Sequence, residues 1–359
     1  MGPTRSPSRA HPASTTATPS GNNSGTTGRS PRRHVLTVAA LVAVLALATL
    51  LSLAYGVHPV PPGDVWRALT QPTGGEHDII VRSLRGPRTV LGILAGVALG
   101  IGGALMQGHT RNPIADPGIL GVNQGAAFGI VCAITVFGVG SLTGFVWFGF
   151  AGALVAATVV FLFGSTGRRG SAPVTLALAG AAVSALLAGL TAALVLGNRQ
   201  GMEVFRFWQV GSLAGRDYDI VLQVLPFLVA GLVLALANTP GLNTLALGDD
   251  VATALGRKPG RTRALGIAAI TLLVGAAVAA CGPIAFVGLI VPHVARTLSG
   301  PDYRRLVPVA GLLGAILLLL ADVAGRLVSG DSLEVGVLCA VLGAPVFIHL
   351  VRGKGLRKL

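Results

Sequence analysis

The sequence predicts an all-α membrane protein that crosses the bilayer about ten times. Hydrophobic residues make up 52% of the 359 residues, and charged residues make up only 11%. A soluble domain carries roughly 25% charged residues, and the mean hydropathy of this chain is accordingly high, at +0.74. The apolar residues also occur in runs long enough to span a bilayer as helices. Composition and run length together favour a polytopic membrane protein.

Ten apolar segments of spanning length can be placed along the chain. The eighth is short, but without it Arg304, Arg305 and the basic C-terminus would lie outside the cell. Basic residues are enriched on the cytoplasmic side of membrane proteins, so this arrangement predicts that both termini are cytoplasmic. The predicted spans are 34–54, 90–107, 119–139, 146–163, 174–196, 220–237, 264–281, 283–298, 307–328 and 333–351.

Residues 1–33 differ in composition from the rest of the chain. They are rich in Ser, Thr, Pro, Gly and Arg, so we expect a disordered, basic cytoplasmic tail ahead of a transmembrane domain at 34–359. The formal charge of +14 follows from the basic residues on the cytoplasmic side. Because aromatic residues are not interleaved with them, the charge argues against nucleic-acid binding.

Several kinds of chemistry are excluded by the residues present. Cys132, Cys281 and Cys339 lie in apolar spans without paired spacing, which favours small buried side chains over a disulfide or a metal site. We expect no metal, no cofactor and no catalytic residues, because the sequence contains no catalytic triad and no GxxxxGKS or GxxxxGKT phosphate loop. Ionisable residues are scarce inside the spans, which argues against ion coupling. If the chain takes part in powered transport, another subunit supplies the energy.

A polar break, NPIADPG at 112–118, separates the second and third spans. Two prolines and a carboxylate leave backbone groups unpaired in a lipid-facing helix, so the break must lie at a membrane surface or inside protein. Gln107 and Asn123 flank the break. Helix capping is the ordinary interpretation of both residues, and contact with a transported substrate is the alternative.

The same pattern returns in the second half of the chain. PIADPGIL begins at Pro113 and PIAFVGLI begins at Pro283, and each segment follows an Arg-Thr pair at nearly the same offset. In the predicted topology the two copies lie on opposite sides of the membrane, which is typical of an inverted repeat in transporters. Chance similarity between two apolar sequences is the alternative.

The connection at 238–263 contains a short predicted helix on the cytoplasmic side. Its carboxylates are placed to cap the first turn, and a glycine ends the helix. A plain connector needs neither caps nor an apolar face, so we predict a docking element for a soluble partner. The basic residues after it have anionic lipid as their ordinary partner. The predicted element comprises Gly248, Asp249, Asp250, Ala254, Leu255 and Gly256.

Arginines on the predicted outer side run against the usual charge bias. Arg85 and Arg88 precede the second span, and Arg326 ends the ninth. An acidic partner, an anionic substrate or pairing within the protein would each explain them. Arg326 lies one helical turn after Asp322, so the two can pair.

Six segments in register resemble the permease family of ABC importers for iron-siderophores, haem and vitamin B12, the FecCD/BtuC type. They are the stretch from Arg85 to Gly129, FWQVGSLAG from Phe207, LALGDDVATALG from Leu245, GPIAFVGLIVPHVAR from Gly282, LLLADVAGR from Leu318 and GVLCAVLGAPVFIHLV from Gly336. The resemblance covers the chain from the first span to the C-terminus, and the NPxADPG segment is most similar to ferric-siderophore permeases of the catecholate type.

The resemblance implies a plasma-membrane permease that pairs with itself or with a paralogue. Separate ATPase subunits would engage the coupling helix at Leu245–Gly256, and an extracytoplasmic binding lipoprotein would dock on Arg85, Arg88 and Arg326. The spans at 174–196 and 333–351 would line the path, and alternating access would move the chelate. A vitamin B12 or haem permease of the same family, or an ion-coupled carrier, is the alternative function.

Overall fold

The computed structural model describes residues 31–165, 173–329 and 333–352, together with Gly2. Within this part of the chain every regular element is helical. The predicted tail at 1–33 therefore lies almost wholly outside the described residues. In chain order the elements are α1 (Pro31–Ala54), α2 (Pro62–Thr70), α3 (Glu76–Ile79), the π-helix η1 (Ile80–Arg85), α4 (Gly86–Thr110), the 3-10 helix η2 (Pro117–Leu120), α5 (Val122–Thr135), α6 (Leu142–Ser165), α7 (Pro173–Leu196), α8 (Arg199–Val210), α9 (Tyr218–Leu245), α10 (Asp249–Ala254), α11 (Pro259–Cys281), α12 (Val287–Ser299), α13 (Tyr303–Ser329) and α14 (Val335–Arg352).

An α-helix lies in each of the ten predicted spans. In the described ranges, seven helices are long and apolar enough to cross a membrane alone, and the shorter apolar helices Val122–Thr135 and Val335–His349 accompany them. The eighth predicted span contains α12, which has only 13 residues and begins after an irregular stretch at 282–286. The all-α fold class is confirmed, and the number of crossings and the side of the termini stay predictions.

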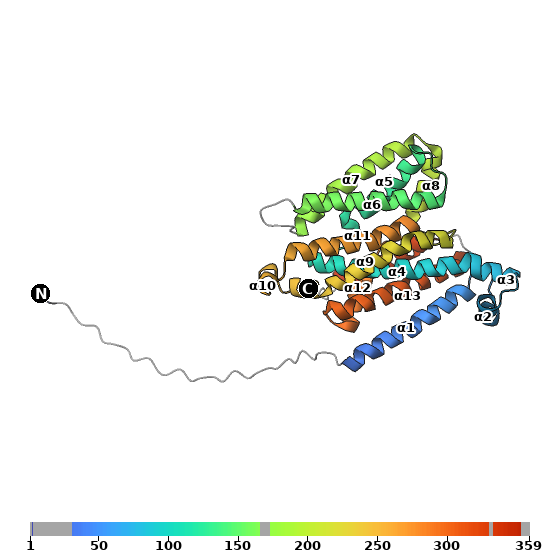
Figure 1. The fold of residues 1–359 in the computed structure, drawn as a ribbon, viewed down its shortest axis with the longest axis horizontal. Helices are drawn as coiled ribbons and strands as arrows, with labels where there is room; N and C mark the ends of the chain where they lie inside the picture. Colours follow the sequence, from blue (N-terminus) through green and yellow to red (C-terminus); the bar gives the residue numbers. More distant parts are fainter. Residues whose placement is uncertain (1, 3–30, 166–172, 330–332, 353–359) are drawn as a thin grey trace.

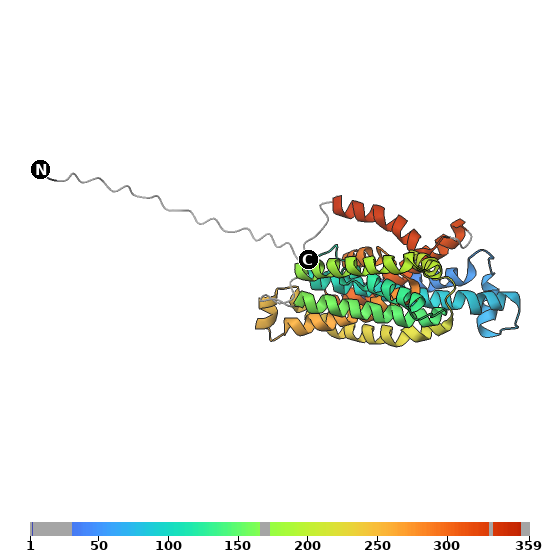
Figure 2. The same cartoon turned by 90° about the horizontal axis from the view of Figure 1, so that it is seen from above.

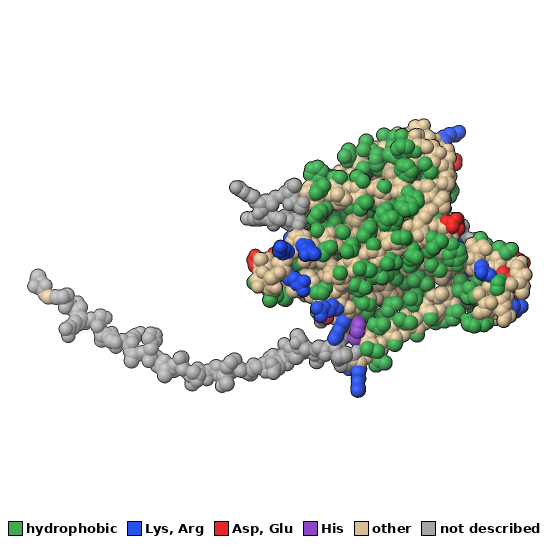
Figure 3. Space-filling model, viewed as in Figure 1, with side chains coloured by type: hydrophobic (Ala, Val, Ile, Leu, Met, Phe, Trp, Pro, Cys, Tyr) green, Lys and Arg blue, Asp and Glu red, His purple; other side chains and the backbone are tan. Residues whose placement is uncertain are grey.

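The long helices run side by side, with α10 at one end of the bundle and α2 and α3 at the other (Figures 1 and 2). Hydrophobic side chains cover the middle of the face seen in Figure 3, whereas Lys and Arg gather near α10 and the start of α1. An apolar belt between charged ends matches the hydrocarbon core of a bilayer. The positive-inside rule then predicts, as the sequence did, that the α10 end faces the cytoplasm.

Helix α4 lies at the centre of the bundle, where it packs against α11, α12 and α13. Most of its residues are buried, and its glycines bring neighbouring backbones very close. A Cβ at Gly96 would lie 2.5 Å from the carbonyl oxygen of Gly314, and a Cβ at Gly103 would lie 1.9 Å from that of Gly288. Membrane helices use small residues for such contacts. These glycines therefore hold the two halves of the chain together backbone to backbone.

Helices α7 and α14 lie at the periphery and expose apolar side chains. Leu178 and Leu186 of α7 are 68% and 62% exposed, and Val341 of α14 is 60% exposed. Figure 2 shows α14 inclined away from the rest of the bundle. Faces of this kind must be covered by lipid or by another subunit.

The connection between α9 and α11 is shorter than the predicted range of 238–263. Helix α9 continues to Leu245 and α11 begins at Pro259, so the connection is 246–258. Pro240 falls within the predicted connection, but it lies inside α9. Proline has no N–H to donate to the Leu236 carbonyl oxygen, and the Thr239 hydroxyl donates to that oxygen instead, at 2.8 Å.

Candidate translocation path and coupling surface

The turn between α4 and α5 has a defined backbone. Arg111 ends α4 in the left-handed region, with φ of 49°. The Asp116 carboxylate then accepts a hydrogen bond from the Gly118 N–H at 2.7 Å, which caps η2. Gly121, with φ of 71°, redirects the chain into α5. The NPIADPG segment is therefore an ordered turn between α4 and α5.

The two copies of the PIA pattern line one cavity of about 560 Å³. Asp116 and Asn123 come from the first half of the chain, and Pro283 and Phe286 come from the second half. Phe286 has φ of 67°, so the chain before α12 is not helical. Transporters place irregular backbone of this kind where it lines a cavity. The cavity is therefore the candidate translocation path within this subunit.

The two residues predicted to flank the break have different surroundings. Asn123 lines the cavity. Gln107 is fully buried, and its side-chain amide donates to the Leu289 carbonyl oxygen at 3.1 Å and accepts from Arg296 at 2.6 Å. In this structure Gln107 joins α4 to α12 and does not line the cavity, so of the two residues only Asn123 lies on the candidate path.

The predicted coupling helix is present as α10, but its start differs from the prediction. Gly248, with φ of 113°, begins the helix, and no side chain caps it. The Asp249 carboxylate instead pairs with Arg111 at 2.5 Å and with Arg263 at 2.7 Å. The capping prediction was wrong because these two guanidinium groups hold the Asp249 carboxylate, which therefore does not turn back to the first N–H groups of the helix. Asp249 thereby links α10 to the end of α4.

The other face of α10 is open. Leu255 is 61% exposed and Val251 is 44% exposed, whereas Ala252 is fully buried against the bundle. Asp250 and Ala254 are also exposed. Gly256, with φ of 76°, ends the element. The helix thus presents an apolar surface at the basic end of the molecule.

A model of the FecCD transport family matches residues 44–353, which is most of the chain. The chain belongs to the FecCD transport family. The permease is 46% identical to the ferric enterobactin transport system permease protein FepD of Escherichia coli, over 89% of this chain and 96% of that protein. It is 40% identical to the cobalamin import system permease protein BtuC of Halobacterium salinarum, over 78% of this chain and 75% of that protein. The resemblance inferred from the motifs is confirmed.

A solved structure supports the same assignment. A metal-chelate type ABC transporter in an inward-facing conformation superposes on the permease with a TM-score of 0.78. It is 30% identical and covers 88% of this chain and 98% of that chain. The chain is thus a multi-pass plasma-membrane permease of an ABC importer, a channel component whose ATPase is a separate subunit.

At the end of the permease opposite α10, Arg85 is only 7% exposed. Its guanidinium donates to the carbonyl oxygens of Leu53 and Ala54, both at 2.8 Å, and to that of His58 at 2.6 Å. These carbonyls lie at and just after the end of α1. Arg85 therefore fixes the chain where α1 stops.

Arg88 and Arg326 share one buried carboxylate. Arg88 donates to both oxygens of the Asp322 carboxylate, from Nη2 at 2.9 Å and from Nε at 3.0 and 3.1 Å. Arg326 pairs with the same carboxylate at 3.1 Å. Arg326 also donates to the Ser52 carbonyl oxygen at 3.0 Å. All of these groups are buried. The three predicted docking arginines point inward here, so docking on them stays a prediction, while the pairing of Arg326 with Asp322 is confirmed.

Proposed function

We propose that this permease pairs with a second permease and carries a ferric siderophore of the catecholate type across the plasma membrane. The cavity between the two halves of the chain is the observation that supports this proposal most strongly. Its polar side chains are those of Asp116, Asn123 and Gln209, and the rest of the lining is apolar. A weakly polar lining suits a conduit, because tight binding would slow release. The uncovered apolar faces of α7 and α14 support a second permease beside this one.

The chelate is assigned by similarity to named relatives. FepD, at 46% identity, is named for ferric enterobactin. Other relatives are named for hydroxamate, citrate and cobalamin, so the catecholate assignment rests on the higher identity. A cobalamin permease is the second candidate, supported by the 40% identity to the protein from Halobacterium.

Two soluble partners act at opposite ends of the molecule in this proposal. Separate ATPases contact the open face of α10, and their closure moves α10 together with α4 through Asp249 and Arg111. An extracytoplasmic lipoprotein delivers the chelate at the other end. Arg85 and Arg326 bind carbonyl oxygens at the end of α1, and Arg88 shares Asp322 with Arg326, so the three arginines shape the docking surface from beneath. The two permeases then alternate between outward and inward access.

Chelate-stimulated ATP hydrolysis tests this function. The permease is reconstituted in lipid with its neighbouring permease and ATPase, and candidate binding proteins are added with their chelates. We expect a ferric catecholate to stimulate hydrolysis and accumulate in the vesicles. Stimulation by cobalamin alone would favour the second candidate. Uptake that survives without ATP and stops when a proton gradient collapses would contradict an ABC importer.

The predicted topology is tested by cysteine labelling. Gln71 follows α2 and Lys258 precedes α11, and both are exposed. In a background without the native cysteines, an impermeant maleimide added to whole cells should label Gln71→Cys. It should reach Lys258→Cys only after the membrane is permeabilised. Labelling of Lys258→Cys in intact cells would contradict cytoplasmic placement of α10.

A further inference from the structure

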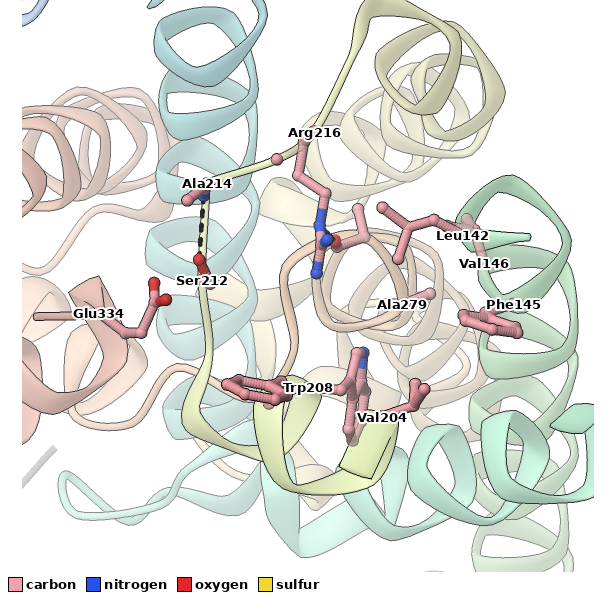
Figure 4. A pocket seen from close by; sticks show the side chains of 13 residues that line it. Leu142, Phe145, Val146, Val204, Trp208, Ser212, Ala214, Arg216, Ala279 and Glu334 are labelled. Atoms are coloured by element: carbon pink, nitrogen blue, oxygen red, sulfur yellow. Dashed lines mark hydrogen bonds between the residues drawn. The ribbon is translucent and has the colours of Figure 1, made fainter. Parts of the chain in front are cut away.

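A second cavity, of about 400 Å³, lies at the end of the bundle opposite α10. The start of α6, helix α8, the end of α11 and the connection at 211–217 enclose it (Figure 4). None of its lining residues lines the path cavity described above. It is therefore a separate feature of the permease.

Arg216 reaches into this second cavity from the 211–217 connection (Figure 4). Its Nε donates to the Ala280 carbonyl oxygen at 2.8 Å, which fixes the plane of the guanidinium. In the described part of the chain neither terminal nitrogen forms a hydrogen bond or an ion pair, although Glu334 lines the same cavity. A guanidinium that is fixed in place and has N–H donors without partners can bind an oxyanion through two parallel hydrogen bonds, in bidentate geometry.

Trp208 supplies a second donor without a partner. The residue is only 6% exposed, and its indole nitrogen has no hydrogen-bond acceptor among the described residues. Figure 4 shows this nitrogen on the side of the ring that faces Arg216. Buried N–H groups are nearly always paired, and leaving one unpaired costs free energy. An oxygen of a bound molecule between the two side chains would pair with both.

The remaining walls favour a flat aromatic molecule. Phe145 and Phe207 line the cavity together with the indole ring of Trp208, and aromatic rings stack or meet edge to face with one another. The volume lies within the range of small-molecule sites. The cavity is large enough for a single aromatic ring with its substituents, but it is too small for a complete siderophore. The Glu334 carboxylate weakens the attraction for simple anions, so the ring contributes part of the recognition.

The cavity is also held in shape before any ligand arrives. The Ser212 N–H donates to the Cys281 carbonyl oxygen at 2.7 Å, and the Gly336 N–H donates to the Gly211 carbonyl oxygen at 2.9 Å. These bonds join the 211–217 connection to the end of α11 and the start of α14. A preformed site loses less entropy when it binds a ligand.

We infer that this cavity binds an anionic aromatic group, a catecholate or aryl carboxylate ring, with its oxygens on Arg216 and Trp208. The inference deepens the proposed function, on which its physiological role rests, because rings of this kind belong to the proposed cargo. The binding itself does not depend on that function.

Equilibrium dialysis with 2,3-dihydroxybenzoate tests the site on the full-length permease with its partner permease in lipid. We expect saturable binding, weakened about tenfold in Arg216→Gln because a charge-assisted bond is lost. Trp208→Phe keeps a ring, removes the N–H and should weaken binding by a smaller factor. Arg206→Gln is the matched control, because this arginine on α8 is exposed and outside the cavity. It should bind as the unmodified protein does.

Competition identifies the class of occupant. Benzoate should displace the probe, whereas benzyl alcohol and acetate should not. Acetate competing as well as benzoate would indicate a carboxylate side chain of a partner protein and would overturn the inference. Unchanged affinity in Arg216→Gln would overturn it as well. If Arg216→Gln does not fold, Trp208→Phe and the competition series decide.

The result also separates this inference from the proposed function. Chelate-stimulated ATP hydrolysis without 2,3-dihydroxybenzoate binding would overturn the site and leave the function intact. Binding of the probe, lost in Arg216→Gln, in a complex that no ferric chelate stimulates would support the site and contradict the function.

Discussion

Replacing Asp322 by Asn is expected to lower the free energy of unfolding of the permease by about 3–5 kcal/mol. The Asp322 carboxylate is 1% exposed and holds both Arg88 and Arg326. Asparagine has the same shape as aspartate but no charge, so it leaves two buried guanidinium groups with no carboxylate between them. Helix α1 should loosen with them, because Arg326 also binds the Ser52 carbonyl oxygen. Thermal unfolding in detergent measures the effect as a fall in the melting temperature.

Asp64→Asn provides the matched control. Asp64 also pairs with an arginine, Arg67, whose side chain is 63% exposed. Exposed ion pairs contribute about 0–1 kcal/mol, so this variant should melt almost as the unmodified permease does. Equal melting temperatures for Asp322→Asn and Asp64→Asn would show that the buried cluster does not stabilise the fold.

Replacing Leu255 by Asp should reduce chelate uptake about tenfold or more, because a charge in a desolvated interface is costly. Leu255 is exposed directly after α10, on the surface proposed to receive the ATPase. Hydrolysis of ATP by the assembled complex should persist but should no longer respond to chelate and binding protein. Uptake and hydrolysis measured on the same vesicles reveal this uncoupling.

Leu69→Asp is the control for that substitution. Leu69 lies on α2 and is 49% exposed, at the other end of the bundle. The change in charge and shape is the same, but it lies far from α10. Uptake should therefore stay coupled to hydrolysis. Normal uptake by Leu255→Asp would remove α10 from the coupling mechanism.

The sequence predicted the helices well because the membrane imposes a simple rule. A backbone in hydrocarbon must pair its own polar groups, so long apolar runs become helices wherever they occur. The ends of α9 were harder to place, since Pro240 normally breaks a helix in water. In this bundle Pro240 lies inside α9, and hydropathy alone carries no information on such packing.

The candidate sites were predicted unevenly for a related reason. Leu255 and Gly256 were found because a helix start, an apolar face and a terminating glycine are local signals. The surroundings of Arg88 were not predicted, because its partner Asp322 lies 234 positions away along the chain. The same holds for Arg111, whose partner Asp249 lies 138 positions away. Pairing across such distances leaves no mark in a single sequence.

The contact between Gly103 and Gly288 bears on how this protein can change over generations. A methyl group at 103 would meet the carbonyl oxygen of Gly288 at 1.9 Å, whereas one at 288 would meet its nearest atom, in Pro117, at 3.1 Å. The first clash requires α12 to shift as a whole, and the second requires only a small adjustment of a ring. Among descendants of a common ancestor, position 103 should therefore stay glycine, while position 288 is freer to become alanine.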